Sequence, residues 1–383
     1  MNRKSLQLLI LVILGTLTLL SSTVFATETR VMSMGNIGPF IRDNSNIFYF
    51  PSTILQYSNQ AVAELRSKED KDDYSIGIHL PISGDAVLGV YLNEPVSLPI
   101  SYSSFASHVE LTTAMTLIAG TKLQNFDLGL AFTMASDSWK DENSSVKMEE
   151  SVRFYNLTAG ISNPNMDVAV TLEFPGVSAK QDPDETSWSG FDFGVQGRYF
   201  MKKSDILELV PLGYLGIGSS SYEQKESSSK YERNGNTLDL SLALGINYQL
   251  GGNNIAVLGL EFFGLSKDVD EIKDGPKYTD TWTTLPAIFI GVESYLKPWL
   301  VTRIGANQEY YSYTSKYEPA EGGESTESTS SDSYFDLSFG FGIEMGGFVL
   351  DAAFNENLFF DGPNFISGQS NSIAHRISLI YKF

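Results

Sequence analysis

Alternating apolar and polar residues are the dominant pattern of this chain. In residues 237–250 every even position, from Leu238 to Leu250, is apolar or aromatic, whereas the odd positions carry Thr, Asp, Ser, Ala, Gly, Asn and Gln. Because side chains alternate between the two faces of a β-strand, one face of this segment is apolar over its whole length. Residues 126–134, 166–174 and 334–345 repeat the pattern, and weaker versions continue to the C-terminus. The pattern predicts an all-β protein.

The length of the runs and of their connections indicates the kind of β protein. Roughly sixteen runs are present, and many exceed the ~5–6 residues typical of soluble strands, which suits a tilted crossing of a bilayer. Turn-like connections such as 251–254 and 346–347 alternate with long acidic ones such as 137–150 and 315–333. A soluble β-sandwich gives no reason for this segregation. We therefore predict a transmembrane antiparallel β-barrel of 14–16 strands over residues 59–383, with short turns at one end and long loops at the other.

Composition narrows the function. The 383 residues include no Cys, and 26 Lys+Arg against 46 Asp+Glu give a formal net charge of −20. The chain thus has no disulfides, no thiolate metal site and no Cys nucleophile, and its acidity argues against binding nucleic acid. A mean hydropathy of −0.09 would suit a soluble protein, but an average hides an apolar face made of every second residue.

Both ends of the chain carry features of an exported barrel. Arg3 and Lys4 precede an apolar run from Leu8 to Leu20, and Ala26 ends a small-residue site, so residues 1–26 are predicted to be a signal peptide cleaved after Ala26. The alternating C-terminal residues resemble the signal by which the barrel-assembly machinery recognises outer-membrane barrels: Ile377, Leu379, Tyr381 and Phe383. The expected location is the bacterial outer membrane, with its lipids and that machinery as partners.

Residues 27–58 lack strand alternation and are dense in Gly, Asn and Pro, which suggests a plug-like segment ahead of the first strand. Arg30, Met34, Gly35, Asp43 and Pro51 follow in order the N-terminal pattern of the FadL-like superfamily, which includes long-chain fatty-acid transporters and type IX secretion barrels. That pattern is Arg-x-x-x-Met-Gly-Gly, then an Asp-rich stretch, then Asn-Pro-Ala. The sequence resembles it over about 25 residues. It departs from it at three positions: Asn36, Phe50 and Ser52.

The resemblance implies a function. In that superfamily, commonly fourteen-stranded, an N-terminal hatch blocks the lumen and hydrophobic substrates leave sideways through the wall. It implies passive transport of small hydrophobic molecules, with a hydrophobic ligand, and makes Arg30, Met34, Gly35, Asp43 and Pro51 the candidates for ligand or plug contacts. The alternative is a barrel that does not transport and serves as a scaffold for surface or secretion partners, with its acidic loops as the interface.

An enzymatic function is the third hypothesis. Nucleophilic catalysis needs a Ser or Thr beside a positioned His, and a His-based zinc site needs three converging ligands. His79, His108 and His375 are separated along the chain and are interpreted as half-exposed residues at strand ends. We therefore expect no catalytic residue, no metal and no cofactor, with an outer-membrane hydrolase as the remaining alternative.

Charged residues on the polar face of the runs are expected to face the lumen. They either pair with one another or line a polar pathway with a mild preference for cations. The candidates are Asp239, Glu293, Arg303, Glu309, Asp336 and Glu344, together with Asp167, Glu173, Asp192, Arg198, Asp351 and Arg376. Aromatic residues near run ends suggest interfacial girdles: Trp139, Trp188, Trp282, Trp299, Tyr310 and Tyr311.

Overall fold

The computed structural model describes residues 27–67, 72–96, 98, 106–111, 114–141, 147–226, 229–320, 323–354 and 376–383. The predicted signal peptide, residues 1–26, and His375 lie outside these residues. In the described residues, no helix is long and apolar enough to cross a membrane.

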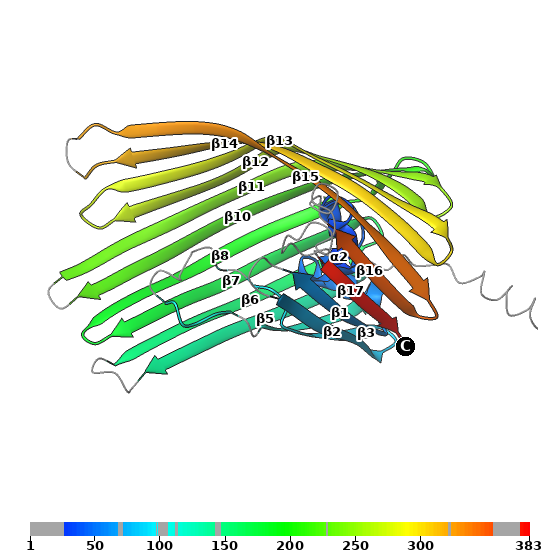
Figure 1. Ribbon diagram of the computed structural model, residues 1–383, viewed down its shortest axis with the longest axis horizontal. Coiled ribbons are helices and arrows are strands. Elements are labelled where there is room, and N and C mark those ends of the chain that lie inside the picture. The colour runs from blue at the N-terminus through cyan, green and yellow to red at the C-terminus, as the bar shows by residue number, and fades with distance from the viewer. Residues whose placement is uncertain are drawn as a thin grey trace, which may run out of the picture.

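The described strands form one closed antiparallel barrel (Figure 1). Sixteen of them make the wall, and the two-residue β9 pairs only with the start of β10. The wall closes because β1 pairs with both β2 and β17. The predicted barrel is therefore confirmed, with sixteen strands. The strands are β1 Gln60–Ser67, β2 Asp72–Ser83, β3 Ala86–Leu92, β4 Ala114–Leu123, β5 Phe126–Asp141, β6 Met148–Asn163, β7 Met166–Gln181, β8 Asp184–Tyr199, β9 Met201–Lys202, β10 Leu207–Glu226, β11 Ser229–Gly251, β12 Asn254–Ile272, β13 Lys277–Lys297, β14 Leu300–Glu318, β15 Thr326–Met345, β16 Phe348–Phe354 and β17 Arg376–Lys382.

The alternation of the sequence separates an outer from an inner face. On β11, Leu238 and Leu242 are 38% and 49% exposed, whereas Ala243 and Asn247 on the other parity are buried. The outer face is thus apolar and exposed. An apolar face of this extent is unfavourable in water and favourable in the hydrocarbon of a bilayer. Closure of the wall also leaves no unpaired strand edge.

The wall is uneven in height. Strands β10 to β15 are 19–23 residues long, whereas β1, β3, β16 and β17 have only 7 or 8. Tight turns close the end at which the C-terminus lies (Figure 1). Gly251–Gly252 and Gly346–Gly347 have positive φ there, which glycine adopts without a steric cost. The long strands extend from the opposite end.

The N-terminal segment, residues 27–57, lies against the inner face of this wall. It contains α2 Glu28–Met32 and three short 3-10 helices, η1 Gly38–Phe40, η2 Asn44–Phe48 and η3 Pro51–Tyr57. Helix α2 contacts β15 to β17, η1 contacts β10 and β11, and η3 contacts β3 to β7. These strands lie on different sides of the ring, so a segment that reaches all of them runs through its interior.

Two expectations about individual side chains were wrong. Trp188 is buried in an inner cluster with Val152 and Val177, and Trp139 is partly buried beside it, so neither belongs to an outer girdle. The register also pairs Trp282 with Ser266 on the lumen side. In contrast, Trp299 and Tyr310 are each 47% exposed.

The second wrong expectation concerned His79, which was predicted to be half-exposed and is fully buried. Its ring nitrogens lie 2.5 Å from the Tyr57 carbonyl oxygen and 2.7 Å from the Tyr91 hydroxyl. This histidine ties the end of the N-terminal segment to β2 and β3.

Candidate functional site

A buried ion-pair network joins the N-terminal segment to the wall. The Arg30 guanidinium holds both carboxylate oxygens of Glu293, with Nε 2.7 Å from Oε2 and Nη2 2.9 Å from Oε1. Glu293 also accepts a 2.7 Å hydrogen bond from Arg303 Nε, and Arg303 Nη1 lies 2.6 Å from Asp351 Oδ1. These four side chains are at most 5% exposed. Fork-to-carboxylate geometry of this kind is the strongest class of charged hydrogen bond.

Asp43 extends the network within the segment. Its Oδ2 lies 3.3 Å from Arg30 Nη1, and its Oδ1 accepts hydrogen bonds from the Ser45 N–H and hydroxyl at the start of η2. Burial raises the pKa of the Asp43 carboxyl above its usual value, while Arg30 acts in the opposite direction. Arg30 thus binds one carboxylate within the segment and one on the wall.

Met34 and Gly35 lie where the segment approaches the wall closely. Gly35 has φ +73°, and a Cβ there would lie 2.6 Å from the Ala306 backbone nitrogen. The Gly35 N–H donates to the Ser338 hydroxyl at 3.0 Å. Met34 is fully buried, and a Cβ on Gly305 of β14 would lie 2.0 Å from its carbonyl carbon. Asn36, where the FadL-like pattern has a second Gly, also has positive φ, +61°, a region that Asn tolerates better than most residues.

We expect Gly35→Ala to displace the segment and Asn36→Gly to leave it in place. The alanine meets both an unfavourable φ and backbone atoms that cannot move aside, whereas glycine relieves a strained φ at an exposed position. Limited proteolysis of the folded barrel measures the difference as faster cleavage within residues 27–58 of the alanine variant alone. Equal protection of the two variants would contradict the tight fit at Gly35.

Pro51 begins η3 and packs on two wall glycines. A Cβ on Gly129 of β5 would lie 2.1 Å from the Ser52 nitrogen, and one on Gly160 of β6 would lie 3.1 Å from Pro51 Cδ. The Ser52 hydroxyl lies 2.6 Å from that of Ser162. All five residues that carry the family resemblance are therefore buried; Arg30, Met34, Gly35 and Pro51 contact the wall, whereas Asp43 binds Arg30 and Ser45 within the segment.

Arg198 on β8 anchors the middle of the segment. Its Nε lies 2.8 Å from Asp167 Oδ2, and its two terminal nitrogens donate to the Ile41 carbonyl and the Asn46 side-chain oxygen, each at 2.8 Å. Both Arg198 and Asp167 were predicted to be lumen charges, but the sequence pattern did not single them out from the others. Their positions on consecutive strands could have predicted the ion pair, because β7 and β8 place the two residues directly opposite each other.

The remaining lumen candidates have other surroundings, and three of them, Glu173, Asp192 and Asp239, line one cavity together. Glu344 accepts a 2.9 Å hydrogen bond from the Tyr295 hydroxyl, and Asp239 lines a separate cavity. Glu309 pairs in register with Tyr334, and Asp336 with Asn307. Of the six, Glu293 and Arg303 form an ion pair with each other.

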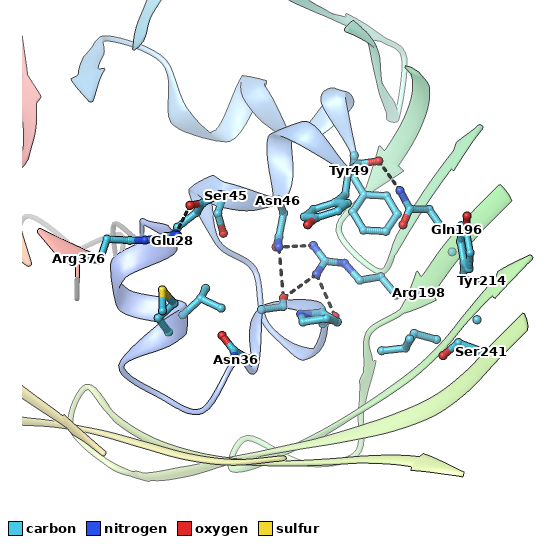
Figure 2. Close-up of a pocket in the computed structure, with 18 residues that line it drawn as sticks. Glu28, Asn36, Ser45, Asn46, Tyr49, Gln196, Arg198, Tyr214, Ser241 and Arg376 are labelled. Atoms are coloured by element: carbon cyan, nitrogen blue, oxygen red, sulfur yellow. Dashed lines mark hydrogen bonds and ion pairs between the residues drawn. The ribbon is translucent and has the colours of Figure 1, made fainter. Parts of the chain in front are cut away.

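A cavity of about 620 Å³ lies between the segment and the wall (Figure 2). On the segment side it is lined by Val31, Met32 and Phe50, among others, and on the wall side by Leu212, Tyr214 and Ser241 of β10 and β11. Its lining is mainly apolar. None of the five family-pattern residues reaches it, so they hold the segment that forms one side of the cavity.

A second cavity, of about 490 Å³, adjoins the first toward the long loops. Tyr214 lines both cavities, and its side chain is 38% exposed. The second cavity is polar, with carboxylates from β7, β8 and β11 to β13 on its surface. The two cavities differ sharply in character on either side of one tyrosine.

Of the two histidines that the structure describes, His108 has a serine and a carboxylate nearby. Its Nδ1 lies 2.8 Å from Glu150 Oε1 and 3.5 Å from the Ser107 hydroxyl, and its ring stacks on Trp139 at 3.9 Å. A catalytic relay needs the acid on one ring nitrogen and the nucleophile on the other, but both groups here meet the same nitrogen. In the described parts of the chain, no group of three His, Asp or Glu is placed to hold a metal ion.

Comparison with known proteins gives likenesses of shape. No family model matches the chain, and no curated protein matches it. Among solved structures, the TodX deltaS2S3 mutant monoaromatic hydrocarbon channel is 10% identical with a TM-score of 0.41, over 94% of this chain and 99% of that one. The alcaligin outer-membrane receptor FauA from Bordetella pertussis is 8% identical with a TM-score of 0.38, over 85% and 75%. The siderophore receptor PirA from Acinetobacter baumannii is 9% identical with a TM-score of 0.35, over 78% of this chain, which spans 62% of that receptor.

Proposed function

We propose that this protein is an outer-membrane barrel that provides a passive route for small, largely apolar molecules. The 620 Å³ cavity beside the N-terminal segment carries the proposal. A cavity of this size is within the range of small-molecule sites, which are concave and mostly apolar with a few placed polar groups. A barrel that only presented its loops to partners would not require a cavity of this kind in its interior.

The surroundings of the cavity support the proposal. The apolar outer face suits bilayer lipids as partners, and the exposed alternate residues of β17 suit recognition by the assembly machinery. The segment is held to the wall by the Arg30 and Arg198 groups and narrows the lumen beside the cavity, so that we assign it the role of a plug. The contacts of His108 argue against a hydrolase, and we propose no enzymatic activity.

Filling the cavity tests this function. Met32→Trp on α2 adds a large ring from the segment side, and the variant is expected to lose at least tenfold in affinity for an apolar probe such as 3-phenylpropanol. The same substitution at Met345, which is 63% exposed outside the cavity, serves as the control and should bind like the unmodified protein. Calorimetric titration of the purified barrel in detergent measures both. No binding by the unmodified barrel would reject the function, and an undiminished affinity of Met32→Trp would reject this cavity as the site.

A further inference from the structure

The charged groups that line the apolar cavity are already paired. Arg198 holds Asp167 and four acceptors of the N-terminal segment, and Figure 2 shows its guanidinium turned toward that segment. Arg376 is paired with Glu28. A carboxylate that entered this cavity would have to compete with these partners, and a buried anion without a cation pays a large desolvation cost.

The adjoining cavity is strongly negative. Its lining includes six carboxylates, of Glu173, Asp192, Asp239, Asp268, Asp270 and Asp280, against one guanidinium. That guanidinium, of Arg233, lies 3.6 Å from Asp270. Carboxylates on low-dielectric walls concentrate cations and exclude anions. A molecule that reaches the apolar cavity by way of this polar one crosses its field.

Tyr214 stands where the two environments meet, with Asp192 and Asp239 on the two strands that flank its own. Asp192 of β8 pairs in register with Gly218 of β10, and Asp239 of β11 pairs with Gly216. A Cβ at Gly218 would lie 2.1 Å from Asp192 Oδ1, so the glycines of β10 make room for an acid beside them. Tyr214, one inward position away from Gly216, borders both cavities.

We propose that the molecule accepted by this barrel has an apolar body and a protonated amine, and that carboxylates are disfavoured. The apolar body occupies the cavity beside α2, and the ammonium group lies past Tyr214 among the carboxylates, near Asp192 and Asp239. This inference rests on the proposed function, because it assigns the substrate class of the same site. It predicts selection by charge among molecules with identical apolar bodies.

Three probes with one apolar body test the inference: 3-phenylpropylamine, 3-phenylpropanol and 3-phenylpropanoate. Calorimetric titration of the full-length mature barrel at low salt is expected to give the tightest binding for the amine, at least threefold tighter than the alcohol. The carboxylate is expected to bind at least tenfold more weakly than the alcohol. The advantage of the amine should shrink as salt screens the field.

The double variant Asp192→Asn/Asp239→Asn removes two charges and keeps the side-chain shapes. Its amine affinity should fall to the affinity that the same variant has for the alcohol, and binding of the alcohol by this variant shows an intact fold. Asp205→Asn, at a side chain that is 97% exposed on the turn before β10, is the matched control and should alter neither. Carboxylate binding equal to or tighter than alcohol binding would overturn the inference and leave the proposed function standing. Failure of all three probes to bind would instead reject the proposed function.

Discussion

Deletion of residues 27–58 is expected to raise the single-channel conductance of the barrel severalfold. The segment contacts β3 to β7, β10, β11 and β15 to β17, and barrels of sixteen strands leave an aqueous channel when nothing fills them. The deletion ends before Asn59, whose carbonyl accepts a 3.1 Å hydrogen bond from the Phe383 N–H, so closure between β1 and β17 is preserved. Planar-bilayer recording of the deleted and full-length mature proteins measures the effect.

A cross-link provides the control for this deletion. The Ser52 and Ser162 hydroxyls are 2.6 Å apart, and the natural chain has no Cys, so Ser52→Cys/Ser162→Cys places one reactive pair between η3 and β6. The oxidised form should conduct like the unmodified protein, because the segment already lies at that position. Unchanged conductance after the deletion would contradict the plug role. A rise on oxidation would show that the open state holds the segment near β6.

The parity of apolar residues predicted the barrel because a membrane imposes it on every strand. The same alternation also predicts ion pairs between neighbouring strands, because inward-facing residues of paired strands lie opposite each other. Glu293 and Arg303 stand directly opposite each other near a short turn, and Asp167 and Arg198 stand opposite each other at the end of the β7–β8 hairpin away from its turn. The errors about the tryptophans came from neglecting parity. Trp139 shares its face with Asp127, on the inward side of β5, and its place near a run end suggested a girdle instead.

Contacts of the N-terminal segment were beyond the reach of sequence patterns. The Arg30–Glu293 pair spans 263 positions, and the segment lacks a periodicity that could orient it. Its path depends on local features such as consecutive positive φ at Gly35 and Asn36 and on inner-wall glycines that admit its backbone. The burial of His79 follows from that path, because its partner Tyr57 belongs to η3. The five residues that carry the family resemblance are buried, but none of them lines the cavity.

Glu293→Ala is expected to weaken the docking of the N-terminal segment by about 3–5 kcal/mol, the cost of leaving a buried charge without its partner. The carboxylate is shared by Arg30 and Arg303, so its removal leaves two guanidiniums facing each other in the interior. Asp351 still compensates Arg303, whereas Arg30 keeps only Asp43, which belongs to the segment itself. The wall thus loses its charged hold on α2, and bilayer recordings should show frequent openings.

The double variant Arg30→Met/Glu293→Met separates the cost of an unpaired charge from the value of the pair. Replacing a buried ion pair by apolar side chains of similar volume is often neutral, and Arg303 retains Asp351, so this variant should open far less often than Glu293→Ala. If the two variants open equally often, the Arg30–Glu293 contact itself holds the segment. If Glu293→Ala conducts like the unmodified protein, the glycine-lined contacts of Met34, Gly35 and Pro51 are sufficient without it. Cross-linking Ser52→Cys/Ser162→Cys in the Glu293→Ala background should reduce the openings, because the disulfide keeps the segment beside β6 when the ion pair is lost.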